Sequence, residues 1–183
     1  MDGAERCIDD ELPFEIPKYW EWTRLATIAN LQTGTTPPTS HPEYFGAGIP
    51  FIKPADIGFC GINYSNESLT CIGADRGRRI PAKSVMMVCI GGSIGKCYYT
   101  EKDTCCNQQI NTASPFDINY KYLWIVMSSD YIQKWVRSSS GGTATPIMNK
   151  SLWGNMLIPI PPADEQIRIV REIENLIPII EQL

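Results

Sequence analysis

Polar side chains of the kinds that read nucleic-acid bases are concentrated in the turn-rich stretches of this sequence. Arg and Lys can donate hydrogen bonds to guanine, Asn and Gln can pair with adenine, and Ser and Thr can contact either base. These stretches therefore predict contacts to a nucleic acid. The residues that we expect to make them are Thr35, Thr36, Lys53, Arg76, Arg78, Arg79, Ser93, Lys96, Gln108, Thr143, Asn149 and Lys150.

Glycines surround one of these residues, Lys96, in the stretch from Ile90 to Cys97. Glycine lets the backbone come close to a phosphate, for which the Lys96 ammonium would be the counter-charge. A tight hairpin with a surface lysine explains the same residues equally well. The stretch is not a nucleotide-binding P-loop, because Ile90 stands where that motif needs its first glycine and Cys97 where it needs Ser or Thr.

Adjacent residues among these candidates cannot all face one ligand. Gln108 and Gln109, expected on a short strand, would point to opposite faces, so that one can be structural while the other reads a base. Arg78 and Arg79 on an extended chain would likewise point in opposite directions. We therefore expect only a subset of the basic cluster to contact any one ligand.

Catalytic and metal-binding patterns are missing from the sequence. Its single histidine, His41, lies among prolines in a loop, which leaves Ser/His/Asp and Cys/His chemistry without another base. The seven cysteines form no Cys-x-x-Cys, so we expect no zinc site and interpret most of them as small buried hydrophobic residues. The Asn-Pro-Pro-aromatic and Asp-Pro-Pro-aromatic motifs of an amino-methyltransferase are absent. A cysteine-dependent enzyme would need a thiolate beside a base, which no pattern here supplies.

The formal net charge of −4 conceals a mildly basic body. Residues 16–160 contain nine acidic and thirteen basic side chains, whereas the other eleven acidic residues lie in 1–15 and 161–183. Local potential governs the approach of a polyanion, so the body is compatible with DNA or RNA without requiring either. The sequence has no run near the roughly 18 apolar residues of a membrane span and no signal-peptide pattern at its start, which predicts a cytoplasmic protein.

Short strands that alternate with a few helices predict an α+β fold, a compact domain followed by a C-terminal helix that pairs as a coiled coil. One internal helix is expected over 119–136, because its apolar residues share a face. Tyr19, Trp20 and Trp22 should anchor an irregular entry segment. The other expected elements are a strand or short helix at 22–31, strands at 49–53, 107–113 and 157–160, a hairpin at 85–99 and a flexible loop at 138–146.

The end of the chain is an apolar run, a group of prolines and then a helix that carries an apolar stripe. The stripe advances by four, three, four and three residues, which is the spacing of a coiled-coil seam. Its members are Ile169, Ile173, Leu176, Ile180 and Leu183. We expect the domain or a neighbouring molecule to cover part of the first two residues of the seam, and the last two to be exposed or paired between copies. Pro178 is expected to interrupt the seam, because proline inside a helix removes a hydrogen bond and kinks it.

As an ordered set, these motifs resemble one half of the DNA specificity subunit of type I restriction–modification systems. The resemblance covers nearly all of the chain after residue 12. The motifs that carry it are Trp20-Glu21-Trp22, Thr33-Gly34-Thr35-Thr36-Pro37, Pro42-Glu43-Tyr44-Phe45, Ile49-Pro50-Phe51-Ile52-Lys53-Pro54-Ala55-Asp56-Ile57, Gly92-Ser93-Ile94-Gly95-Lys96, Asn107-Gln108-Gln109, Ile158-Pro159-Ile160-Pro161-Pro162, Glu165-Gln166 and Ile169-Val170.

The resemblance implies a non-catalytic subunit that recognises one half of a bipartite DNA target. Residues 1–160 would be the target recognition domain, irregular over 1–12, and residues 161–183 the start of a conserved spacer and dimerisation helix. The implied partners are double-stranded DNA, modification subunits that hold S-adenosylmethionine and methylate adenine, and a second recognition half or second copy that pairs through the helix. A third subunit would translocate and cleave DNA. We expect no cofactor, metal or membrane partner for this chain itself.

Other interpretations stay open at this point. A complete specificity subunit has two recognition domains, so we expect either a half-length subunit that dimerises or part of a two-domain subunit. The chain could also be the recognition domain of a longer single-chain DNA methyltransferase. A protein-interaction module without DNA binding is the remaining alternative, and it predicts no salt-dependent association with DNA.

Overall fold

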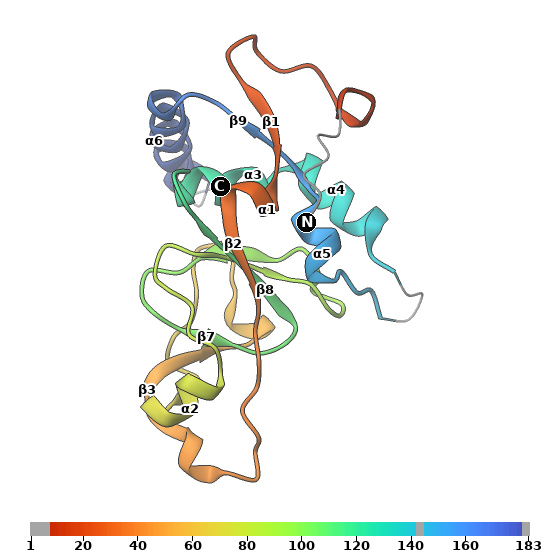
Figure 1. The fold of residues 1–183 in the computed structure, drawn as a ribbon. Helices are drawn as coiled ribbons and strands as arrows, with labels where there is room; N and C mark the ends of the chain where they lie inside the picture. Colours follow the sequence, from red (N-terminus) through yellow and green to blue (C-terminus); the bar gives the residue numbers. More distant parts are fainter. Residues whose placement is uncertain (1–7, 142–144, 181–183) are drawn as a thin grey trace.

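A computed structural model describes residues 8–141 and 145–180, and it mixes short strands with helices as the sequence predicts (Figure 1). The α-helices are α1 (Leu25–Ile28), α2 (Cys71–Arg76), α3 (Tyr120–Ser128), α4 (Asp130–Ser139), α5 (Lys150–Gly154) and α6 (Ala163–Ile180). The 3-10 helices are η1 (Asp9–Glu11), η2 (Pro42–Tyr44) and η3 (Pro54–Asp56). The strands are β1 (Glu21–Arg24), β2 (Ala29–Thr33), β3 (Phe45–Ile52), β4 (Ser68–Leu69), β5 (Val85–Val88), β6 (Cys97–Tyr99), β7 (Cys105–Cys106), β8 (Ile110–Pro115) and β9 (Leu157–Ile160).

The main sheet has the strand order β2-β8-β5-β6, and all its neighbouring strands are antiparallel. Its β5 has no polar residue because both of its faces are buried. Val85 and Met87 pack with side chains of α3 and α4, whereas Met86 and Val88 enter a second core on the other face. The pairing of β5 with β6 confirms the hairpin predicted over 85–99.

Two helices occupy the stretch for which the sequence predicts one. Ser129 separates α3 from α4: its backbone is extended (φ −64°, ψ 151°), and its hydroxyl accepts a hydrogen bond from the Ile132 amide at 3.4 Å. Serine suits such an N-cap because its side chain satisfies a backbone donor that the helix cannot. The single-helix prediction is therefore wrong, since apolar spacing does not register a cap. Ser138 and Ser139 also belong to α4 and not to the predicted loop.

A smaller sheet has the strand order β4-β3-β7. Its central strand β3 is antiparallel to β4 and parallel to β7, with Phe51 opposite Cys105 and Ile52 opposite Cys106. The strand predicted at 49–53 is present, and it begins earlier, at Phe45. Figure 1 shows β3 and α2 at the end of the molecule remote from α6. Because β7 runs almost directly into β8, one short piece of chain joins the two sheets.

The first and last strands pair with each other. β1 is antiparallel to β9, with Glu21 opposite Ile160 and Arg24 opposite Leu157. Before β1, Trp20 is partly buried, but the Tyr19 side chain is 79% exposed. The predicted anchoring role of Tyr19 is wrong, because this residue lies in the turn that the Trp20 amide closes onto the Pro17 carbonyl at 2.8 Å.

The terminal helix α6 packs on α3 through residues that coiled-coil spacing leaves out. Gln166 and Val170 are 4% and 6% exposed. Of the predicted seam, Ile169 and Ile173 are half-buried, and Leu176 is 50% exposed. The first turns of the helix are therefore covered partly by the domain itself, and the stripe turns outward toward Leu176.

The helix continues to Ile180, so Pro178 does not end it, and the expected kink and interruption of the seam stay predictions. A proline removes one backbone donor, and this one lies in the last turn of the described helix, where little of the hydrogen-bonded ladder follows it. The Ile180 side chain and Leu183 lie outside the part of the molecule that the structure describes. None of the helices within 8–141 and 145–180 combines the length and apolarity that a membrane span requires.

The buried hydroxyl of Tyr122 ties α3 to β9, because it donates to the Pro159 carbonyl at 2.6 Å. We expect Tyr122→Phe to lower the free energy of unfolding by about 1–2 kcal/mol, since it removes one buried hydrogen bond and leaves the rest of the ring in place. Urea denaturation measures the change. The matched control is Tyr19→Phe, which alters an exposed ring and should leave the stability unchanged. An equal effect of both substitutions would contradict this account of the α3–β9 contact.

Candidate nucleic-acid interface

Loops from distant parts of the sequence meet at one end of the main sheet. Antiparallel pairing sets Thr33 opposite Asn111, Val88 opposite Ile110, and Met87 opposite Cys97. The end of β2, the start of β8, the end of β5 and the start of β6 therefore lie at the same edge. We name this region the loop edge; it consists of residues 33–36, 89–96, 107–109 and 145–148.

Backbone hydrogen bonds hold the segments of the loop edge together. The Gly34 and Thr35 amides donate to the Ile110 and Cys106 carbonyls at 3.0 and 2.9 Å. Gly34 is buried, and a Cβ at this position would collide with the backbone oxygens of Cys106 and Asn107. Glycine is thus required for the 33–36 segment to pass so close to the turn that precedes β8.

Residues 107–109 form a turn that splits into structural and exposed side chains. Asn107, which is 7% exposed, donates through Nδ2 to Gln109 Oε1 at 2.9 Å, and its Oδ1 accepts from the Gln109 amide at 3.1 Å. Gln109 Nε2 reaches the Ile90 carbonyl at 3.4 Å. Gln108 is exposed, and its Oε1 accepts from the Thr36 hydroxyl at 2.7 Å. The strand prediction is wrong for these three residues, because the turn closes before β8 begins at Ile110.

The glycine-rich turn between β5 and β6 is held from outside by a glutamine of α4. Gly91 and Gly95 have φ angles of 97° and 92°, which favour glycine. Gln133 Nε2 donates to the Gly95 carbonyl and to the Met127 carbonyl, both at 2.9 Å. The turn presents an exposed Lys96, and its Ser93 is half-buried with its carbonyl accepting from the Lys96 amide at 3.2 Å.

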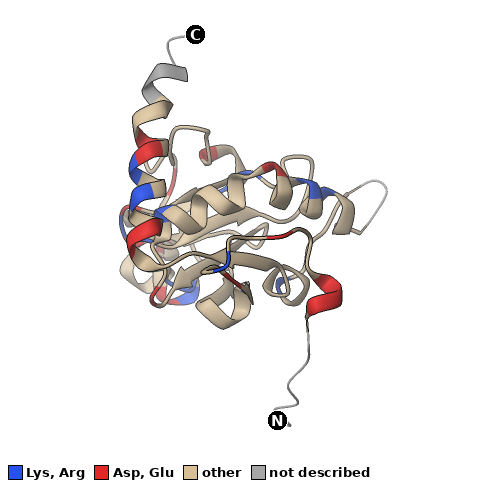
Figure 2. Ribbon diagram, turned by 90° about the horizontal axis from the view of Figure 1, so that it is seen from above, with Lys and Arg blue, Asp and Glu red and all other residues tan. Residues whose placement is uncertain are grey.

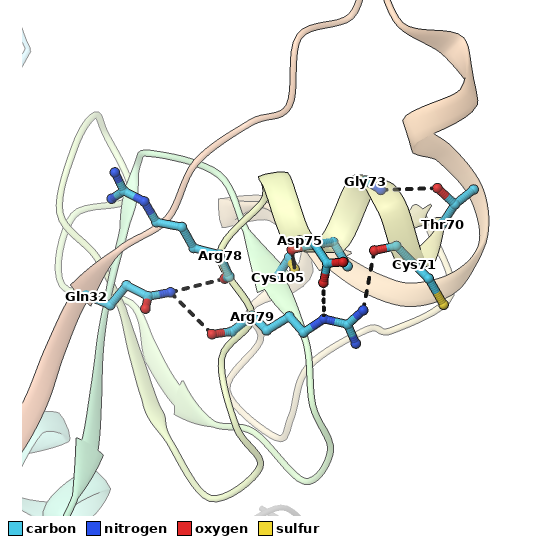
Figure 3. Close-up of polar contacts among 9 residues, drawn as sticks. Gln32, Thr70, Cys71, Gly73, Asp75, Arg78, Arg79 and Cys105 are labelled. Carbon is cyan, nitrogen blue, oxygen red and sulfur yellow. Dashed lines mark hydrogen bonds and ion pairs between the residues drawn. The ribbon is translucent and has the colours of Figure 1, made fainter.

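The side chains of Arg78 and Arg79 point in different directions, and the Arg79 guanidinium lies against Asp75 and Cys71 of α2 (Figure 3). Arg78 Nη1 donates to the Thr33 carbonyl at 3.2 Å, and its own carbonyl accepts from Gln32 Nε2 at 3.0 Å. Arg79 Nε donates to Asp75 at 2.9 Å, and this bond raises the pKa of the guanidinium. The two side chains diverge as expected. The backbone at Arg78, however, is not extended but left-handed, with a φ of 55°.

The structure does not bring the remaining basic candidates into the loop edge equally. Lys53 borders it, because Asn107 donates its amide to the Ile52 carbonyl at 3.1 Å, but the Lys53 ammonium already forms an ion pair with Glu67. Arg76 is exposed on the last turn of α2. Arg76 and Arg79 therefore belong to the α2 surface, outside the loop edge.

The candidates that follow the loop edge have other surroundings. Asn149 caps α5, with its Oδ1 accepting from the Leu152 amide at 2.8 Å. Lys150 lines a shallow depression together with Asn30 and Phe116, which lie toward the opposite end of the β2–β8 pair. Thr143 falls outside the described residues.

The described core thiols and His41 do not lie together as an activated nucleophile and its base. Burial raises the pKa of the Cys89 thiol to about 12 and of the Cys105 thiol to about 11, so both stay protonated at neutral pH. Burial also raises the pKa of Cys106. His41 lies at the surface, with its Nδ1 2.8 Å from Glu43 Oε1. Within 8–141 and 145–180, no cluster of His, Cys, Asp and Glu has the geometry of a metal site.

The cysteine prediction holds for part of the set. Cys89, Cys105 and Cys106 are buried in the core, and Cys97 is half-buried. Cys60 and Cys71 are exposed instead. Cys60 lies in a bend and Cys71 at the start of α2, so both are outside the core strands. The residue type alone therefore does not predict the burial of a cysteine.

Acidic and basic groups are distributed over different parts of the fold (Figure 2). Acidic side chains mark η1 near the N-terminal end, and α6 carries both acidic and basic side chains. The loop edge, by contrast, contributes Lys96 and contacts Arg78, and no acidic residue occurs in its segments. Its potential therefore suits a polyanion.

Comparison with known proteins decides the family. A family model described as the type I restriction modification DNA specificity domain matches residues 17–183. The chain belongs to this family. It is a target recognition domain of the kind found in specificity subunits.

Curated members of the family align with most of this chain. The specificity subunit of the type I restriction enzyme HindI of Haemophilus influenzae is 32% identical over 162 residues, which cover 86% of this chain and 35% of that subunit. The MjaIX specificity subunit of Methanocaldococcus jannaschii is 26% identical over 160 residues, with 85% and 37% covered. The chain thus spans about a third of the length of these relatives.

Solved structures from such systems have the same fold. A chain from a type I R-M system, solved for its complex assembly and conformational transition, superposes with a TM-score of 0.72 at 21% identity, covering 90% of this chain and 40% of that one. The HsdS subunit from Thermoanaerobacter tengcongensis gives a TM-score of 0.68 at 21% identity, covering 90% and 38%.

Sequence reasoning missed the side chains that hold the loop edge in shape. Asn107 and Gln133 were not among the candidates, and Gln109 was given no defined partner. The signal that could have identified Gln133 is a polar residue beside the apolar Ile132 and Val136 of a helix, because an amide that is taken out of water needs hydrogen-bond partners. The partners themselves lie 38 and six residues away along the chain, at Gly95 and Met127.

The adjacent residues Gln108 and Gln109 offer a matched test of the turn. We expect Gln109→Ala to lower the free energy of unfolding by about 1–3 kcal/mol, because it leaves the buried Asn107 amide without its partner. Gln108→Ala should change the stability by less than about 0.5 kcal/mol, since its side chain is exposed. Chemical denaturation of both variants measures the difference. Equal effects would show that the turn does not depend on Gln109.

Proposed function

We propose that this chain is the part of a type I restriction–modification enzyme that reads one half of a bipartite DNA target. The observation that supports this proposal is the loop edge, where polar and basic side chains from separate segments lie at one end of the main sheet in a chain of the specificity family. In the curated relatives the corresponding subunits are named specificity subunits. Recognition of DNA sequence follows from this membership, and the bipartite target is our proposal.

The geometry supports a division of roles within the loop edge. The exposed Gln108 and the half-buried Thr36 lie in contact with each other. Their amide and hydroxyl groups are of the kinds that form hydrogen bonds with base edges. Lys96 stands on a glycine turn that permits close approach of a phosphate. Arg78 extends from the same edge with donors that suit guanine or phosphate. We therefore assign base contacts to Gln108 and Thr36, and a phosphate contact to Lys96.

We further propose that the covalent chemistry belongs to partner subunits. Modification subunits would hold S-adenosylmethionine and methylate adenine at sites that this chain selects, and another subunit would cleave DNA. The missing methyltransferase motifs and the protonated core thiols support this assignment. The role of the chain is then to supply binding free energy that distinguishes one sequence from others.

The two parts of the chain have separate roles in this proposal. Residues 1–160 form the recognition domain, and residues 161–183 begin a helix that pairs with the matching helix of a second half or a second copy. Leu176, half-exposed on the outward side of α6, and the half-buried Ile169 and Ile173 would form the start of that contact. Pairing would cover apolar surface that the domain leaves in water.

Substitutions of Lys96 and Arg78 distinguish phosphate contacts from base contacts. We expect Lys96→Ala to weaken binding to all DNA sequences alike and to reduce the slope of log K against log salt by about one. A base contact by Arg78 predicts that Arg78→Ala relaxes the preference at one target position. Fluorescence anisotropy with matched and mismatched duplexes, in the assembly with modification subunits, measures both.

Arg79→Ala is the matched control, because the Arg79 guanidinium faces Asp75 on α2. It should leave DNA affinity and specificity unchanged. Unchanged binding after both Lys96→Ala and Arg78→Ala would show that the loop edge is not the interface. Equal loss with Arg79→Ala would indicate a general effect of removing positive charge.

Mapping methylated adenines in the host genome, with and without this gene, tests the function as a whole. We expect one bipartite motif to lose its methylation when the gene is deleted and to regain it when the gene is restored. A gene variant with Gln108→Ala should change only one half of that motif. Unaltered methylation after deletion would contradict the proposal.

A further inference from the structure

The junction between the recognition domain and α6 is short and stiff. Only Pro161 and Pro162 separate β9 from α6. Their rings restrict the backbone φ angles, and the Pro162 carbonyl accepts from the Glu165 and Gln166 amides at 2.9 and 3.0 Å. The helix therefore starts at once, with little freedom in the connection.

One buried amide side chain spans this junction. Gln166 is 4% exposed, although Asp164, Glu165 and Arg168 on the same turns of the helix are charged. Its Oε1 accepts from the Asn119 amide at 2.9 Å, and its Nε2 donates to the Pro161 carbonyl at 3.0 Å. A carboxamide is suited to this position because it accepts and donates at once. Since Asn119 also caps α3, Gln166 joins α6 to the start of α3 and to the linker.

Contacts on neighbouring turns support the same arrangement. Trp20, just before β1, donates through Nε1 to Glu165 Oε2 at 3.1 Å. Two turns further along α6, Glu174 forms an ion pair with Lys121 of α3. Val170 lies between these polar contacts and is 6% exposed. The helix is thus held by the residue before β1, by the linker after β9 and by the start of α3.

We propose that Gln166 is a positioning residue that locks α6 to the recognition domain, so that the two move as one rigid body and select one spacer length between half-sites. The functional part rests on the proposed reading of a bipartite target. One additional base pair shifts the second half-site by about 3.4 Å and rotates it by roughly 35°. With a rigid junction, the loop edge cannot follow the displaced half-site and loses its contacts to DNA. With a loose junction, the domain can reorient and keep those contacts.

Residual dipolar couplings of the 183-residue chain test the lock without DNA. In the unsubstituted protein, amides of α6 and of the main sheet should fit one alignment tensor. Gln166→Met keeps the side-chain length but removes both hydrogen bonds, so the α6 couplings should shrink relative to those of the sheet. Exchange of the Asn119 amide should also become about tenfold faster, because its acceptor is lost. Asn175→Met, an amide-to-thioether change on the exposed face of α6, is the control and should alter neither measurement.

Binding to duplexes with different spacers tests the consequence in the complete assembly with modification subunits. The unsubstituted protein should discriminate against spacers one base pair longer or shorter than the preferred one. Gln166→Met should reduce that discrimination about tenfold, with base preferences within each half-site unchanged. A merely destabilised protein would instead lose affinity for all duplexes in the same proportion.

Each result decides a separate part of the proposal. A single alignment tensor for Gln166→Met would overturn the lock, and an unchanged spacer preference beside loosened couplings would overturn its role in spacing. Absence of any bipartite preference in the unsubstituted protein would contradict the proposed function, while the couplings would still decide the lock. If Gln166→Met does not fold, Trp20→Phe serves in its place: it removes the indole N–H that donates to Glu165, together with part of the ring, and should loosen α6 in the same direction.

Discussion

The fold depends on one short piece of chain, residues 105–115, that pairs with strands of both larger sheets. β7 lies parallel to β3, and β8 lies between β2 and β5. Between β7 and β8 the chain must turn within three residues, 107–109, and this requirement explains the buried Asn107 and the close approach of Gly34. The turn is at the loop edge, so the element that joins the sheets also supports the candidate DNA contacts.

Side-chain amides of one chemical type have opposite roles in this molecule. Three of these amides form hydrogen bonds with backbone groups or with each other, which holds their side chains in place: Asn107, Gln109 and Gln166. Gln108, between two of these, is exposed and contacts only a loop hydroxyl among the bonds described. A buried amide must be satisfied within the protein, whereas an exposed amide can exchange water for a base edge. Burial therefore separates the amides that hold the structure in place from Gln108, which we propose to read a base.

Several predictions made from the sequence are confirmed because they depend on local patterns. The hairpin over 85–99, the strand at 157–160 and the terminal helix follow from apolar spacing and from glycine and proline positions. The single helix over 119–136 was wrong because a serine cap at Ser129 leaves the apolar spacing on both sides intact. The strand prediction was wrong at 107–109, where Asn107 and Gln109 form hydrogen bonds with each other in a turn. The alternation of polar and apolar residues that marks a strand cannot predict such bonds.

By itself, the sequence determined the family, the α+β class, the absence of catalytic motifs and the loops rich in base-reading side chains. These features depend on residue type and near-neighbour order. Only the tertiary structure decided which candidates share a surface: it groups Thr36, Gln108, Lys96 and Arg78, and it assigns Arg79 to α2 and Asn149 to a helix cap. The physical reason is that the deciding hydrogen bonds join residues distant in sequence, so strand pairing determines them, and not residue type.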